Sequence, residues 1–155
     1  MGRTIPIYLG EPTMHAPRYR VSLRFHSQTV DPSEICGQLG LQPEWKRKIG
    51  EPRTTPTGVL LGGVYDWSYC TFNLIPHPDE ELHEMLDRVV DGLLQHEALF
   101  RRIQDGGGST EFFIAWYSTG NTGDTFGNAL LSKLGVLRID LALDVYGESR
   151  QPVEE

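Results

Sequence analysis

The sequence predicts an α+β fold: a two-layer sandwich in which helices cover one face of a mainly antiparallel sheet, ferredoxin-like or related. Two observations support this class. Strand-like segments, several of them with apolar side chains at every second position, alternate with helical segments along the chain. The first and last strands, at 19–27 and 137–146, are polar on one face, which indicates that this face of the sheet is open to water.

The chain of 155 residues is expected to form one domain with two irregular ends. Residues 1–18 are rich in proline and glycine and show no periodic pattern, which predicts an extended N-terminal arm. Residues 19–147 carry all of the predicted elements and make up a single α+β domain. The charged residues 148–155 are expected to be a flexible tail.

The first strand is followed by a helix with clear start and stop signals. Apolar and polar side chains alternate along residues 19–27, so one face of this strand is expected to be buried. Asp31 is placed as the N-cap of a short helix, with Pro32 at its first position. Gly40 is expected to end this helix.

The next segment mixes basic residues, prolines and glycines. Residues 45–53 are expected to form a loop or a ragged edge strand, because the prolines here and just beyond exclude a central strand. Residues 59–65 are predicted to pair with 66–75 as a hairpin, with the Gly62-Gly63 pair bending the chain.

The second half of the domain alternates helices and strands. Apolar residues recur at helical spacing from 82 to 94, and a break near Gln95 separates a shorter helix that includes Ile103. Residues 112–117 are apolar on both sides and predict a central strand. Asp124 is placed as the cap of the next helix. The last strand, 137–146, is expected to point its odd-numbered side chains inward: Leu137, Ile139, Leu141, Leu143 and Val145.

Composition excludes several classes of function. The formal charge of −7 repels phosphate backbones and anionic lipids, so no nucleic-acid partner is expected. No apolar run approaches the roughly 18 residues of a membrane span, so no membrane partner is expected either. Cys36 and Cys70 are expected to be buried free thiols, although spacing alone leaves a disulfide open. Together these observations favour a cytoplasmic protein.

The first candidate site is a basic cluster that can bind a phosphate or a carboxylate. It holds four cations within eight residues of an acidic chain: Lys46, Arg47, Lys48 and Arg53. Gly50 would let backbone N–H groups approach the anion. The alternative is a solvated loop whose charges offset Glu44 and Glu51.

The second candidate site is the polar face of the sheet. Arg24 and His26 lie on it, with Trp67 and Tyr69 expected beside them and Trp45 in the adjacent loop. Charged and aromatic side chains together suit recognition of a partner or a small ligand. The alternative is simple cross-strand pairing, for example of Arg24 with Asp144.

No catalytic, metal or cofactor site is predicted. His83 and Asp87 lie one helical turn apart, but no third metal ligand stands at usable spacing. No nucleophile-elbow or phosphate-loop motif occurs in the chain.

Several short motifs, in their order, resemble one family. They are Asp31-Pro32-x-Glu34, Leu39-Gly40-Leu41-x-Pro43, Lys48-x-Gly50-Glu51-Pro52 with Trp67 after it, Leu134-Gly135 and Asp144-Val145-Tyr146. Over residues 19–147 the chain resembles the bacterial domain-of-unknown-function family 4279. The resemblance implies a small bacterial domain and carries over no activity, cofactor or catalytic residue.

Three functions remain open from the sequence. The first is a non-enzymatic binding or interaction domain, immunity-like in one version, that recognises an anionic ligand or a protein partner through the basic cluster and the sheet face. The second is a small enzyme with His26 as acid or base beside Arg24. The third is a homodimer built through the strand 112–117 or the uncovered sheet.

Overall fold

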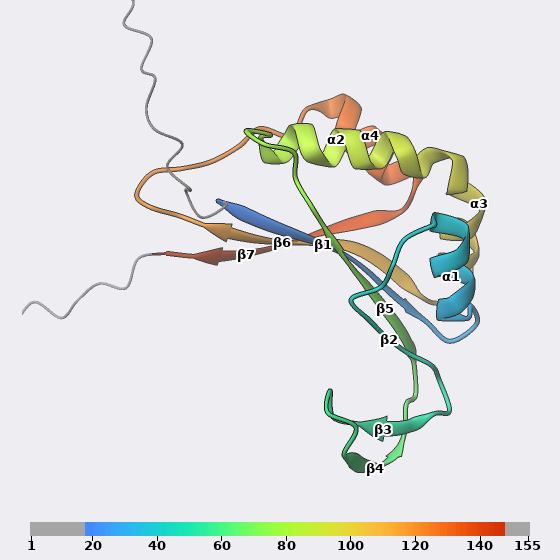
Figure 1. The fold of residues 1–155 in the computed structure, drawn as a ribbon. Helices are drawn as coiled ribbons and strands as arrows, with labels where there is room; N and C mark the ends of the chain where they lie inside the picture. The colour runs from blue at the N-terminus through green and yellow to red at the C-terminus, as the bar shows by residue number, and fades with distance from the viewer. Residues whose placement is uncertain (1–17, 148–155) are drawn as a thin grey trace, which may run out of the picture.

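The computed structural model describes residues 18–147 and confirms the α+β class. One five-stranded sheet has the order β2-β5-β1-β6-β7, and helices α1 to α4 lie on one side of it (Figure 1). Neighbouring strands are antiparallel except β6 and β7, which are parallel. The ferredoxin-like subclass stays a prediction. The predicted tail and the predicted arm up to residue 17 lie outside the described residues.

Strand β1 (Tyr19–Ser27) is the centre of the sheet. It pairs with β5 (Ser68–Leu74) on one side and with β6 (Ser109–Tyr117) on the other. Its odd-numbered side chains are buried under the helices, while the even-numbered ones face the open side. The predicted alternation of this strand is therefore confirmed. Since β6 lies between β1 and β7, its backbone is paired on both sides and offers no edge to a second copy.

Helix α1 (Pro32–Leu39) begins and ends where the sequence predicts. Asp31 Oδ1 accepts a hydrogen bond of 2.8 Å from the N–H of Ser33 and so caps the first turn. Gly40 follows with φ of 64°, a left-handed conformation that suits glycine and ends the helix.

Helix α2 (Leu82–Leu93) continues through the 3-10 turn η1 (Leu94–His96) into α3 (Glu97–Asp105), which confirms the predicted break near Gln95. The apolar faces of both helices pack on the sheet. Phe25 of β1 lies at the centre of this core, with Phe72 and Phe100 as its aromatic neighbours.

Helix α4 (Asn128–Val136) is present, but its predicted cap is wrong. Its N-cap is Gly127 and no side chain caps it. Asp124 instead reaches α2, where Oδ2 accepts a hydrogen bond of 2.9 Å from the N–H of His83 and Oδ1 lies 2.7 Å from His83 Nδ1. The carboxylate thus satisfies the start of a helix 41 residues earlier in the chain.

Asp124→Ala should therefore destabilise the protein through α2 rather than α4. We expect a loss of about 1 kcal/mol, as for other lost helix caps, measured by urea unfolding. Asp124→Asn keeps an oxygen acceptor for the His83 N–H and should lose less. Equal losses in the two variants would contradict this assignment.

Strand β7 (Ile139–Tyr146) corrects two predictions. Leu137 is the buried end of α4 rather than the first strand residue. Leu141, Leu143 and Val145 are not buried, with 37%, 60% and 56% of their surface exposed. The end of β7 runs beyond the helix layer, so only Ile139 at its start is covered (Figure 1).

The predicted hairpin of residues 59–65 with 66–75 is also wrong. β5 pairs with β1 and with the short edge strand β2 (Trp45–Arg47) instead. β3 (Pro52–Thr54) and β4 (Leu60–Val64) form a separate two-stranded hairpin that projects from the body of the domain (Figure 1). The chain turns at residues 55–58, while the Gly62-Gly63 pair lies inside β4 with positive φ at both positions.

Within residues 18–147, no helix has the length and apolar composition to cross a bilayer.

Candidate ligand-binding groove

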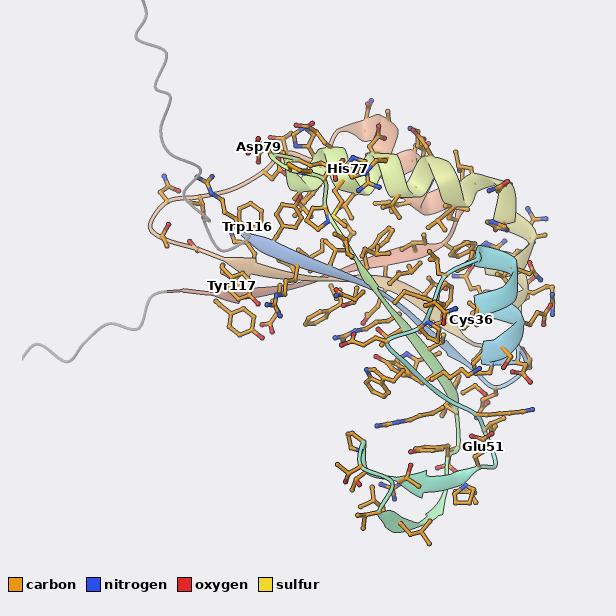
Figure 2. All side chains as sticks on the ribbon, viewed as in Figure 1. Cys36, Glu51, His77, Asp79, Trp116 and Tyr117 are labelled. Atoms are coloured by element: carbon orange, nitrogen blue, oxygen red, sulfur yellow. The ribbon has the colours of Figure 1, made fainter. Side chains whose placement is uncertain are left out.

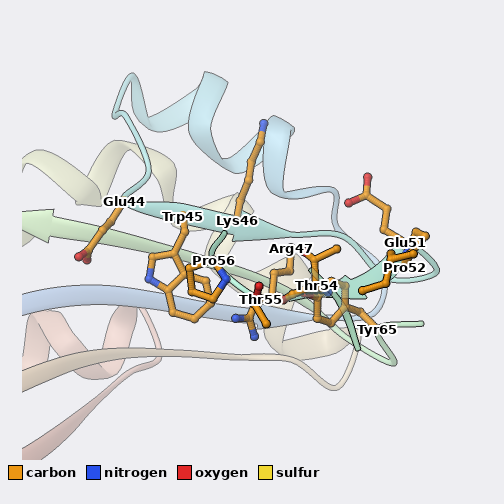
Figure 3. A pocket seen from close by; sticks show the side chains of 11 residues that line it. Glu44, Trp45, Lys46, Arg47, Glu51, Pro52, Thr54, Thr55, Pro56 and Tyr65 are labelled. Carbon is orange, nitrogen blue, oxygen red and sulfur yellow. Dashed lines mark hydrogen bonds between the residues drawn. The ribbon is translucent and has the colours of Figure 1, made fainter. Parts of the chain in front are cut away.

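A cleft of about 970 Å³ separates the edge strand β2 from the projecting hairpin (Figure 3). Its walls come from β2, from the hairpin and from the segment that links β4 to β5. The lining residues are Glu44, Trp45, Lys46, Arg47, Glu51, Pro52, Thr54, Thr55, Pro56, Leu60 and Tyr65.

Two smaller depressions continue this cleft onto the open face of the sheet. One of about 370 Å³ shares Trp45, Arg47 and Tyr65 with the cleft and extends to His26 and Trp67. Another of about 320 Å³ runs along the face from Trp45 toward β7. Trp45 lines all three, so we name the continuous surface the Trp45 groove.

The groove is lined by aromatic rings in contact with one another. Trp45 is 41% exposed and Trp67 is 40% exposed, which is unusual for a side chain as large and apolar as tryptophan. The Trp45 ring lies 4.8 Å from Tyr69, and Tyr69 lies 4.6 Å from His26, between ring centres. This row crosses β2, β5 and β1 because Tyr69 is paired directly with His26.

Arg47 lies between two of these rings. Its guanidinium carbon is 4.2 Å from the centre of the Trp45 ring and 5.2 Å from that of Tyr65. The Tyr65 hydroxyl accepts a hydrogen bond from the Thr54 N–H at 3.1 Å and donates one to the Thr54 carbonyl at 3.2 Å, so the ring is held in place. The backbone hydrogen bond from Thr54 lowers the pKa of Tyr65, and the positive charges of Arg47 and Arg53 add to this effect. Among residues 18–147, the Arg47 guanidinium forms no ion pair and no side-chain hydrogen bond, although the Arg47 backbone is paired with β5.

Two other cations of the basic cluster, Lys46 and Lys48, do not converge with Arg47. Lys46 points to the opposite side of β2 (Figure 3), where its Nζ donates a hydrogen bond of 3.0 Å to Ser33 Oγ of α1. Lys48 forms an ion pair of 2.9 Å with Asp31, which lowers the pKa of that carboxyl. Arg53 lies on the hairpin strand β3.

The predicted backbone anion site at Gly50 is not formed. Its φ of 83° requires a glycine, but its N–H donates a hydrogen bond of 2.9 Å to the Tyr65 carbonyl and is not available to a ligand. A compact four-cation site is therefore absent from this part of the chain, and Arg47 is the cation of the cluster that lies within the aromatic row.

Arg24 occupies the open face beyond the aromatic row. Its guanidinium carbon lies 3.7 Å from the centre of the Phe113 ring, and Nη1 lies 3.8 Å from Glu111 Oε1. The predicted pairing with Asp144 is wrong, because Arg24 is in register with Glu111 while Asp144 is in register with Ala115. Arg24 Nε is buried and has no hydrogen-bond partner among the described residues.

His26 is half-buried on the same face. Burial lowers the pKa of His26, the positive charge of Arg24 lowers it further, and Glu111 acts in the opposite direction. The net shift is downward, so the imidazole is mainly neutral at pH 7.

Two further aromatic residues lie on this face: Tyr146, which the alternation of the last strand predicted to point outward, and Tyr117, which was not predicted there. Tyr117 and Tyr146 stack with ring centres 5.4 Å apart. Figure 2 shows Tyr117 on the open side and Trp116 on the helix side of β6. Because the segment 112–117 is apolar on both sides, Phe113 and Tyr117 were not assigned to the open face, although strand alternation places both on the face of Arg24.

Metal ligands do not gather anywhere in residues 18–147: no three or more His, Cys, Asp and Glu side chains form a group that could hold an ion. His83 contacts Asp124, and Asp87 contacts Lys133 at 3.0 Å, so each of these two residues already has a protein partner.

Fold and groove together define a small α+β domain with an aromatic, arginine-containing open sheet face and a projecting hairpin. A family model described as "Domain of unknown function (DUF4279)" matches residues 17–148, and the chain belongs to this family. No curated protein and no solved structure matches the chain.

Proposed function

We propose that this domain is a non-enzymatic binding module whose Trp45 groove recognises a ligand with an anionic group beside a flat, apolar part. The observation that carries the proposal is the position of Arg47, stacked between Trp45 and Tyr65 with no acidic partner among the described residues. A structural arginine is usually paired with a carboxylate, whereas a ligand-binding one keeps its N–H edge available.

Stacking prepares this arginine for an anion. The two rings lie 4.2 Å and 5.2 Å from the guanidinium carbon and restrict this side chain before a ligand arrives, so less side-chain entropy is lost on binding. A carboxylate or phosphate can accept two parallel hydrogen bonds from that edge. Trp45 and Tyr69 remain available to stack on a flat group next to the anion.

The surrounding acids limit the charge of such a ligand. Glu44 and Glu51 lie at the two ends of the cleft, with Arg47 between them (Figure 3), and Asp66 lines the smaller depression. These carboxylates disfavour a polyanion in the groove but tolerate a single anionic group at Arg47. This agrees with the acidic net charge and supports a small ligand rather than a nucleic acid.

Arg47→Ala should abolish ligand-induced stabilisation while leaving the fold intact. Compounds that combine a carboxylate or phosphate with an aromatic ring, nucleotides included, are screened for a rise in Tm with the wild-type protein. For each compound that stabilises the wild-type protein, we expect the Kd to rise about 10- to 100-fold in Arg47→Ala. The reason is that a hydrogen-bonded contact to a charged group contributes about 1.5–3 kcal/mol to the free energy of binding.

Lys48→Ala is the matched control. It removes the same charge one residue further along, from a side chain paired with Asp31 and outside the groove. Its Kd should change less than threefold. Equal weakening in both variants would mean that net charge, and not the Arg47 geometry, attracts the anion. A screen without any hit would move the proposal from a small ligand to a protein partner on the same surface.

A second candidate function is a small enzyme with His26 as general base. The half-buried, mainly neutral imidazole lines a concave depression with Tyr69 and Trp67, which favours proton abstraction at neutral pH. His26→Gln should then abolish turnover of a groove ligand while its Kd changes little.

We also infer a cytoplasmic location, supported by the free thiols of both cysteines.

A further inference from the structure

The two cysteines of the chain lie together although 34 residues separate them. Cys36 projects from α1 (Figure 2), and its Sγ is 3.6 Å from Sγ of Cys70 on the helix side of β5. Both are free thiols. Cys70 is fully buried, whereas Cys36 is partly exposed. One cysteine of the pair is therefore nearer to solvent, and the sulfur of the other lies beside its own.

We propose that Cys36 and Cys70 are a redox pair that a peroxide converts into an intramolecular disulfide joining α1 to β5. In the first step the Cys36 sulfur attacks a peroxide oxygen, the O–O bond breaks, and Cys36 becomes a sulfenic acid while water leaves. In the second step the Cys70 sulfur attacks the sulfenic sulfur, the S–O bond breaks, and the Cys70 thiol proton leaves with the hydroxyl group as a second water. Two thiols and one hydrogen peroxide thus yield one disulfide and two waters.

Exposure and charge assign the order of the two steps. Burial and the neighbouring Cys36 sulfur raise the pKa of Cys70 to about 12, so Cys70 stays a protonated thiol and is a poor first nucleophile. Peroxide must reach the sulfur that it oxidises, and Cys36 is the residue of the two that is partly exposed. Cys70 then acts as the resolving thiol.

The surrounding contacts hold the two sulfurs near each other. α1 is tied to the β2 region by the Lys46–Ser33 hydrogen bond and the Lys48–Asp31 ion pair. β2 is in turn paired with β5, where Lys46 is in register with Cys70. The two sulfurs, now 3.6 Å apart, must approach to the S–S bond length of about 2.05 Å. We expect small rotations of the two side chains to achieve this.

The disulfide would enclose the segment that forms the groove. Residues 36–70 contain β2, β3 and β4, so the bond would close this loop at its base. A cross-link over a loop of this length restricts the unfolded chain, and we expect a rise in Tm of about 5–15 °C. This inference does not rest on the proposed ligand.

The test uses the full-length protein with hydrogen peroxide as the oxidant. The protein is oxidised, denatured, alkylated with N-ethylmaleimide and weighed by mass spectrometry. We expect a monomer that has lost two hydrogen atoms and takes up no alkyl group, with a raised Tm that dithiothreitol reverses. Two alkylated thiols after oxidation, or a disulfide-linked dimer on a non-reducing gel, would overturn the proposal.

Single variants test the order of the steps and do not need the disulfide. In Cys70→Ala, the sulfenic acid on Cys36 has no resolving thiol and should be trapped by dimedone. In Cys36→Ser, Cys70 is buried and should stay unlabelled at the same peroxide concentration. Labelling of Cys70 in Cys36→Ser, with none of Cys36 in Cys70→Ala, would reject the assigned roles.

Discussion

Phe25→Ala should lower the free energy of unfolding by about 3–5 kcal/mol. Phe25 is fully buried near the C-terminal end of β1, and its ring centre lies 5.9 Å from that of Phe72 and 5.7 Å from that of Phe100. The ring therefore joins the two central strands to α3, and its removal leaves a cavity that three elements border. Domains of this size have about 5–15 kcal/mol of stability in total, so the variant should be marginal.

Urea unfolding followed by circular dichroism measures this loss. Phe113→Ala is the control, because it removes the same side chain from the open face of the neighbouring strand, where Phe113 is only partly buried. It should lose much less. If Phe25→Ala does not fold, Phe25→Leu should lose about 1–2 kcal/mol and give the same ranking. A smaller loss for Phe25→Ala than for Phe113→Ala would contradict the core described above.

Glu80 should make the protein acid-sensitive between about pH 4.5 and about pH 2. Its carboxylate accepts hydrogen bonds of 2.8 Å from Nε and Nη2 of Arg88 and one of 3.1 Å from the N–H of His77. The bonds from Arg88 lower the pKa of Glu80 from 4.5 to about 2, against the opposing effect of burial. Because the folded pKa lies below the unfolded one, this stabilisation is complete above pH 4.5 and is lost as the pH falls toward 2.

Glu80→Gln should remove that pH dependence. Above pH 5 the variant should be less stable by about 1.5–3 kcal/mol, since it loses charged hydrogen bonds but keeps the shape of the side chain. Near pH 2 the difference from wild type should shrink toward zero. Unfolding in urea at several pH values measures both limits.

Glu97→Gln is the control for a surface ion pair. Glu97 contacts Arg101 one helical turn away and is 43% exposed, so its loss should stay below about 1 kcal/mol. Parallel pH profiles of Glu80→Gln and the wild type would show that Glu80 is not the source of the acid sensitivity.

Local sequence patterns predicted where the helices and strands lie better than which segments they pair with or contact. The alternation along 19–27 and the Asp31 cap were read correctly because each depends on neighbouring residues only. The break near Gln95 has the same local origin. Asp124 was misassigned because its acceptor role is satisfied by His83, which lies 41 residues away and leaves no local signal.

The wrong hairpin has a similar physical reason. Segment 59–65 leads directly into 66–75, and sequence proximity favours pairing between them. β5, however, carries buried side chains and lies between β1 and β2 in the main sheet. Every residue of β4 is exposed, so β4 has no buried side chain that would place it in that sheet. The Gly62-Gly63 pair was interpreted as a bend, but it lies inside β4 and the chain turns at residues 55–58.

Four of the site residues chosen from the sequence lie together, and their role in binding stays a prediction. Trp45, Arg47, His26 and Trp67 line one connected depression, whereas Lys46 points away from it. Spacing along the chain placed four cations together, and the strand geometry of β2 separated them. Applied to β2, the alternation that identified β1 would have set Arg47 on the face of Trp45 and Lys46 on the opposite face.

The projecting hairpin has an evolutionary consequence. None of its side chains enters the core, and backbone hydrogen bonds from Gly50 N–H to the Tyr65 carbonyl and from Tyr65 N–H to the Glu51 carbonyl join its two arms at the base. Substitutions at the tip of the hairpin, residues 55–59, can therefore change one wall of the groove without a loss of folding stability. In this way the ligand specificity of the groove can change while the hydrophobic core stays the same, as in antibodies, whose loops vary on a constant framework.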